Sequence, residues 1–142
     1  MKKSNNFLNF LLLLLIANMS INVIAEPLDS EISIYSKDAE MVVNKYLSAL
    51  ANGEIDSIRN SLGGEFLERR SLQLSNPIYA DKLRDLYRGA EFTLRGSELL
   101  DKSRMSVNVE IIYFNQHLAK IKFILVANNQ NQFRIISENE IH

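Results

Sequence analysis

One stretch of this chain, SVNVEIIYFNQHLAKIKFILVAN at residues 106–128, constrains the fold more than any other. Apolar and polar residues alternate on both sides of a polar break, which predicts two β-strands with one apolar face. The side chains expected on that face are Val107, Val109, Ile111 and Tyr113 in the first strand, and Ala119, Ile121, Phe123 and Leu125 in the second. A sheet with one apolar face needs a second layer over that face, so another part of the chain must cover the apolar face of these two strands.

The same alternation predicts four strands in the C-terminal half, over residues 91–99, 105–114, 118–127 and 133–140. A slip of one residue would exchange the two faces of a strand, so charge matching helps to choose the register. A turn over Asn115–His117 would place Glu110 opposite Lys122, and the next hairpin would place Lys122 opposite Glu138. We therefore expect a row of charged residues on the solvent face, formed by Glu110, Lys122 and Glu138.

The last hairpin has the loop NNQNQ at residues 128–132. That loop would pair Ala127 with Phe133 and Leu125 with Ile135, which keeps apolar residues together. The strands then form an antiparallel meander.

The covering layer comes from the N-terminal half, where apolar residues recur at helical spacing. One helix is expected to begin with Ser36 as its N-cap and to end at Asn52-Gly53. A second fits residues 54–62, and a third follows the Asn76-Pro77 cap. Residues 65–75 fit either a helix or a short strand, so their role stays open. The predicted class is α+β, with N-terminal helices packed on a curved antiparallel meander.

The first 25 residues have the pattern of a secretory signal peptide. Lys2 and Lys3 precede an apolar run, and Val23-Ile24-Ala25 fits a cleavage site. A spanning helix needs about 20 apolar residues, whereas asparagine and serine interrupt this run. We expect cleavage after Ala25, a lead-in over 26–36, one domain over 37–142, and a bacterial periplasmic or secreted protein without a stable membrane anchor.

Composition excludes several classes of protein. The expected leader carries two of the 16 basic residues and none of the 17 acidic ones, which leaves a mature net charge of −3 with histidine neutral. Such mild acidity argues against a nucleic-acid partner. The chain has no cysteine, so its core must hold without disulfides, and thiol chemistry is excluded. No spacing of ligand residues predicts a metal site or a cofactor.

The segment YLSALANGEIDSIRNSL at residues 46–62 resembles the opening of the NTF2-like (cystatin-like, SnoaL-like) superfamily: an apolar helix, a turn with glycine and an acid, and a second short helix. The order of later elements is similar too, over about residues 37–140. This resemblance implies a cone-shaped fold with a cavity at its wide end. The superfamily includes ketosteroid-isomerase-like and polyketide-cyclase-like enzymes as well as non-catalytic binding domains, so the fold alone does not choose a function.

Two sets of residues are candidates for a site inside the cone. The lining expected for a pocket is Tyr46, Leu50, Tyr79, Tyr87, Phe92 and Tyr113. An isomerase needs a carboxylate base beside a hydroxyl donor, and the best candidate pair is Glu98 with Tyr113. Glu98 joins the apolar face only if it continues the alternation of Phe92 and Leu94.

The absence of a stronger polar constellation favours an exported, non-enzymatic binding or accessory domain for a small hydrophobic ligand or a protein partner. The alternatives are a ketosteroid-isomerase-like or cyclase-like enzyme, and an immunity or inhibitor-type protein that binds another protein. A protein-binding role predicts an apolar patch on the outer sheet, for which Ile112, Ile124 and Ile136 are the candidates. A homodimer through the same patch is also consistent with the pattern.

Overall fold

The computed structural model describes residues 26–141, so the expected signal peptide over residues 1–25 lies outside the described residues. The helices are α2 (Glu26–Asn52), α3 (Ile55–Ser61), α4 (Gly64–Leu74) and α5 (Tyr79–Leu86). The strands are β1 (Glu91–Leu99), β2 (Arg104–Ile112), β3 (Leu118–Ala127) and β4 (Phe133–Glu140). The chain divides into two compact units between Ile34 and Tyr35, and the second unit contains the whole sheet and α3–α5.

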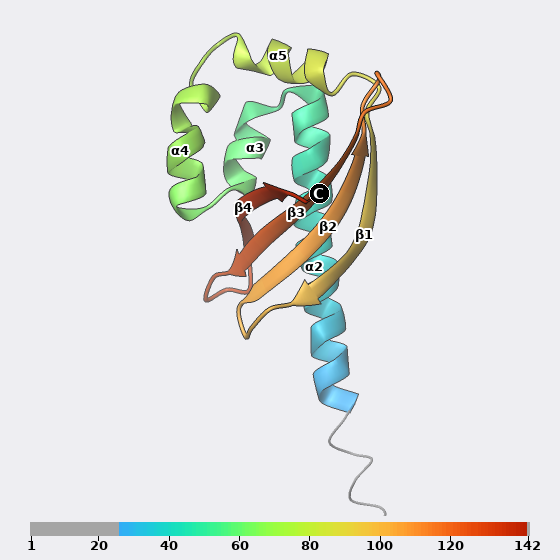
Figure 1. Ribbon diagram of the computed structural model, residues 1–142. Coiled ribbons are helices and arrows are strands. Elements are labelled where there is room, and N and C mark those ends of the chain that lie inside the picture. Colours follow the sequence, from blue (N-terminus) through green and yellow to red (C-terminus); the bar gives the residue numbers. More distant parts are fainter. Residues whose placement is uncertain (1–25, 142) are drawn as a thin grey trace, which may run out of the picture. The chain divides into compact units, whose positions relative to one another are not determined.

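The second unit is an α+β fold of two layers, as the sequence predicts. Its strands form one antiparallel sheet in the order β1-β2-β3-β4, which is a simple meander. The sheet curves around the C-terminal part of α2, while α3 and α4 lie beside β4 and α5 lies at one end of the sheet (Figure 1). The helices therefore cover the apolar face of the hairpin.

The core lies between α2 and the sheet, with α3 closing it beside β4. Its largest fully buried side chains are Tyr46, Leu47, Leu50 and Val43 from α2, Ile58 from α3, and Met105, Val107, Val109, Ile111, Phe123, Leu125 and Ile135 from the sheet. Full burial of each large apolar side chain contributes about 1.5–3 kcal/mol, and no disulfide adds to this.

The helix boundaries agree with the sequence at some ends and differ at others. Helix α2 ends where it was expected, before Gly53, whose φ of 65° suits the left-handed position. It begins at Glu26, however, so the expected lead-in is helical and Ser36 lies within the helix, not at its N-cap. The predicted cap at Asn76-Pro77 lies in the turn before α5: the Oδ1 of Asn76 accepts the Ile78 amide at 3.1 Å, but the helix begins at Tyr79 with Ile78 as its N-cap.

The ambiguous segment over residues 65–75 belongs to a helix, α4. Phe66 and Leu74 of this helix are buried, whereas Leu72 is exposed. The alternation of Leu72 and Leu74 that allowed a strand therefore reflects two opposite sides of a helix.

The β2–β3 hairpin has a different register from the predicted one. Its three-residue loop covers residues 114–116, because the amide of Tyr113 donates to the carbonyl of His117 at 2.9 Å. Gln116 takes the left-handed conformation (φ 63°) that such loops require at their last position. The loop begins one residue earlier than expected, so Glu110 pairs with Lys120 and not with Lys122. Each β2 residue thus pairs with the β3 residue two positions before its predicted partner. A shift of two residues keeps every side chain on the same face, so the inner face keeps its predicted members.

The β3–β4 hairpin starts in the predicted register and then departs from it. Ala127 pairs with Phe133 and Leu125 with Ile135, as expected. Ile136 is then an extra residue, a β-bulge, so the next pair is Ile124 with Ser137. Beyond the bulge Glu138 lies opposite the buried Phe123 and points to the inner face, so the predicted charged row does not form.

Strand β1 contains a second bulge, between Leu94 and Gly96. Ser97 consequently faces inward, opposite Val107, and its hydroxyl donates to Glu40 of α2 at 2.6 Å. Glu98 therefore turns to the outer face, against the simple alternation that would have placed it inside.

The outer edge of β4 is covered by the turn between α3 and α4. The amide of Gly63 donates to the carbonyl of Ile135 at 2.9 Å, and Leu62 forms a parallel bridge with Ile135. A Cβ atom on Gly63 would lie 2.8 Å from the Cβ of Arg134, which is closer than such atoms come in proteins. This approach is possible only with glycine.

We predict that Gly63→Ala lowers the free energy of unfolding by about 1–3 kcal/mol, the usual cost of forcing extra atoms into a packed contact. Urea unfolding would measure this change. Arg134→Gly removes the opposing Cβ, so the double variant should lose less than the sum of the two single variants. Additive losses would show that the contact with Arg134 is not the cause.

Candidate functional site

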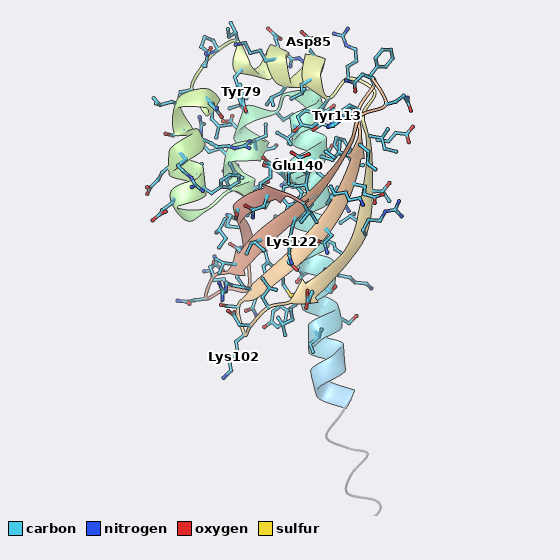
Figure 2. All side chains as sticks on the ribbon, in the orientation of Figure 1. Tyr79, Asp85, Lys102, Tyr113, Lys122 and Glu140 are labelled. Atoms are coloured by element: carbon cyan, nitrogen blue, oxygen red, sulfur yellow. The ribbon has the colours of Figure 1, made fainter. Side chains whose placement is uncertain are left out.

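An open pocket of about 650 Å³ lies at the end of the sheet nearest α5. Figure 2 shows Tyr113 and Glu140 at this end, toward the helix that carries Asp85, while Lys102 lies at the opposite end of the sheet. The lining side chains come from α4, α5, the β2–β3 hairpin, β3 and β4: Arg70, Asp85, Leu86, Tyr113, Phe114, Asn115, His117, Ala119, Ile121, Glu138 and Glu140.

A polar network of three side chains meets this pocket. Arg70 of α4 donates from Nη2 to Oε2 of Glu138 at 3.0 Å and from Nη1 to the hydroxyl of Tyr46 at 3.1 Å. The Tyr46 hydroxyl in turn donates to the same Oε2 at 3.2 Å. The three residues come from α2, α4 and β4, so the network joins both layers of the fold.

The ion pair of Arg70 with Glu138 is mostly buried. The side chains of Arg70 and Glu138 are only 24% and 18% exposed. The guanidinium of Arg70 also lies over the ring of Phe66, 5.0 Å from its centroid, which adds a cation–π contact. Charges with so little contact with water need such partners, because loss of hydration alone would be costly.

The electrostatics of the network favour a protonated tyrosine and a charged arginine. Burial raises the pKa of Tyr46 well above its ordinary value, and the neighbouring carboxylate of Glu138 raises it further, whereas Arg70 opposes both. Burial lowers the pKa of Arg70, but Tyr46 and Glu138 more than offset this, so the net change is upward. Tyr46 thus serves as a hydrogen-bond donor and not as a phenolate.

A cluster of four aromatic side chains lies at this end of the fold, and two of them, Tyr113 and His117, line the pocket. The ring of Tyr87 lies 5.8 Å from that of Tyr113 and 6.0 Å from that of Phe92, and the imidazole of His117 stacks on Tyr113 at 6.0 Å. Burial raises the pKa of Tyr87 and, to a smaller extent, that of the half-buried Tyr113. Both tyrosines are therefore protonated and neutral over the ordinary pH range.

The pocket residues predicted from sequence are divided between the core and the pocket. Tyr113 lines the pocket, whereas Tyr46 and Leu50 are fully buried core residues and Tyr87 is nearly so. Tyr79 and Phe92 are partly buried against the core. Tyr46 still contributes to the site through its hydroxyl.

Sequence reasoning missed the charged residues of the pocket. Arg70 lies in the segment that the sequence left open, and Glu138 was expected on the solvent face. One signal for Glu138 was available, because consecutive isoleucines, Ile135 and Ile136, interrupt the alternation in β4. Gly96 within β1 is likewise typical of a bulge, the one that turns Glu98 to the outer face.

The candidate catalytic pair is not brought together. Glu98 is exposed on the outer face opposite Ser106, whereas Tyr113 lies beyond the other end of β2. At about 3.3 Å per residue the two positions are more than about 20 Å apart along the strand. They therefore do not form an acid–base site in this fold.

The three isoleucines expected on one outer patch also lie apart. Ile124 pairs with Ser106 and Ser137, while Ile112 pairs with Leu118 near the hairpin loop. Ile112 and Ile124 are thus about 20 Å apart along the sheet. Ile136 is the bulge residue beside Ile124.

No protein-family model matches this chain, and the searches found no similar curated protein or solved structure. Within residues 26–141, no three histidines or carboxylates gather closely enough to hold a metal ion. No helix in the same part of the chain combines the length and hydropathy of a membrane span.

We predict that Arg70→Met lowers the free energy of unfolding by about 2 kcal/mol, because Glu138 would remain mostly buried without its cation. Arg88→Met is the matched control, since its ion pair with Asp85 is exposed and should contribute less than about 0.5 kcal/mol. Adding Glu138→Leu to Arg70→Met should restore most of the loss in urea unfolding. Equal costs for the Arg70 and Arg88 variants would contradict a structural role for the network.

The raised tyrosine pKa values predict a loss of stability at alkaline pH. A tyrosine whose pKa is higher in the folded than in the unfolded chain holds its proton more tightly when folded. Its stabilising contribution is complete below pH about 10 and falls by up to about 1.4 kcal/mol per pH unit above it.

Tyr46→Phe should reduce the fall in the free energy of unfolding between pH 8 and pH 11, two values chosen on either side of about 10. Urea unfolding at the two pH values would measure it. At pH 8 the variant should lose about 1–2 kcal/mol, because the hydrogen bonds to Glu138 and from Arg70 disappear. An unchanged alkaline slope would show that Tyr46 does not carry the effect.

Proposed function

We propose that this chain is a binding domain that holds a small amphipathic ligand in the pocket at the α5 end of the sheet. The observation that carries the proposal is the composition of this pocket. Its volume suits a small molecule, its floor carries a fixed polar network, and its rim carries apolar side chains that the core does not use. Phe114 and Leu86 of that rim are 82% and 58% exposed.

A ligand would gain both affinity and orientation from this arrangement. Its apolar part would cover Leu86 and Phe114, which removes apolar surface from water. Its polar end would meet the side of the pocket formed by Arg70 and the β4 carboxylates. Because Arg70 and Glu138 are already fixed by each other and by Tyr46, little ordering would be needed on binding.

We also propose that the domain is an exported member of the NTF2-like superfamily. In support, an apolar helix followed by short helices precedes a curved antiparallel meander, with a pocket at one end of the sheet. Export rests on the leader pattern of residues 1–25. The isomerase-like alternative loses its only candidate pair, since Tyr113 and Glu98 lie apart, and we carry no catalytic role forward.

The test is binding of the neutral apolar dye Nile red to the purified protein, followed by its fluorescence. Leu86→Ser should weaken dye binding about tenfold, because the variant removes an apolar wall of the pocket. Leu72→Ser is the matched control: Leu72 is also an exposed helical leucine, but it does not line the pocket. Absence of dye binding, or an equal effect of the two variants, would refute the proposed site.

A further inference from the structure

The charges that line the pocket do not balance. Arg70 is paired with Glu138, and Asp85 is paired with Arg88 outside the pocket. Glu140 lines the same pocket, and no lysine or arginine among the described residues lies within ion-pair distance of it. After the internal pairs are counted, an excess of negative charge remains on the β4 side of the pocket.

Aromatic groups line the same pocket as this negative charge. Tyr113, Phe114 and His117 all belong to the hairpin that forms one wall, and the rings of Tyr113 and His117 stack. The face of an aromatic ring attracts a cation through its quadrupole, and more strongly when water is partly excluded. A cation would therefore meet a carboxylate and aromatic rings within a single pocket.

An anionic head group would find no free lysine or arginine side chain in the pocket lining. Arg70 is the one lysine or arginine among the lining residues, and its guanidinium is already engaged by Glu138 and Tyr46. To reach Arg70 fully, an anion would have to displace Glu138 and leave that mostly buried carboxylate without its cation. The network therefore selects against a negatively charged head group.

We infer that the ligand class of this pocket is a cationic amphiphile, an apolar chain or ring system that carries an amine. The apolar part would lie against Leu86 and Phe114, and the ammonium group would lie near Glu140, Tyr113 and His117. This inference rests on the proposed function, because it assigns a ligand class to the same pocket.

The experiment compares three ligands that share one chain and differ in the head group: dodecylamine, dodecanol and dodecanoate. Each is titrated into the purified protein below its micelle concentration, and displacement of Nile red gives the dissociation constant. We expect dodecylamine to bind most tightly and dodecanoate most weakly, with the advantage of the amine shrinking as salt is added.

Glu140→Gln should weaken dodecylamine binding about fivefold and leave dodecanol unchanged, since one partly exposed charge pair is lost. Glu68→Gln makes the same change of charge on an exposed residue of α4 outside the pocket and should change neither. Equal binding of the three ligands, or an equal effect of the two variants, would overturn the cation preference while the pocket itself stands. Failure of all three ligands and of the dye would instead refute the proposed function.

Discussion

The contact of Arg70 with Glu138 and Tyr46 is the interaction on which the rest of this structure depends. It joins one residue from each of α2, α4 and β4, at distances of 3.0–3.2 Å, where few other polar contacts cross between the layers. The network fixes the position of α4 relative to the sheet and orients the Tyr46 ring, whose edge packs on Phe123. It also places the charged groups that face the pocket. A change in any of the three residues would therefore affect stability and the site together.

The network exists because the strands are irregular. One extra residue, Ile136, inverts the faces of the last part of β4 and brings Glu138 inside, opposite Phe123. The bulge in β1 does the same for Ser97, which then reaches Glu40 of α2. In both cases the bulge turns a polar side chain from the solvent face to the inner face, where it makes a polar contact with a helix. The bulges are thus part of the way in which the layers are joined.

The α5 end of the sheet is one of the places where the fold leaves apolar side chains exposed, and there they surround a pocket. The core between α2 and the sheet is filled by fully buried side chains and leaves no role for Leu86 or Phe114. In a chain without disulfides, apolar residues that do not help to fill the core add exposed surface without adding stability. Their position around a pocket with a preformed polar floor is the physical reason to propose binding there.

The sequence by itself determined the α+β class, the four strands to within a few residues, and the apolar face that α2 covers, because these follow from local periodicity. The stop at Gly53 and the Ala127–Phe133 pairing were also readable, since each depends on neighbouring residues. Only the tertiary structure decided the register of the β2–β3 hairpin, the helical state of residues 65–75 and the inward turn of Glu138. Periodicity does not specify where one extra residue enters a strand, and that insertion is favourable only because Arg70 and Tyr46, from distant parts of the chain, compensate the buried carboxylate.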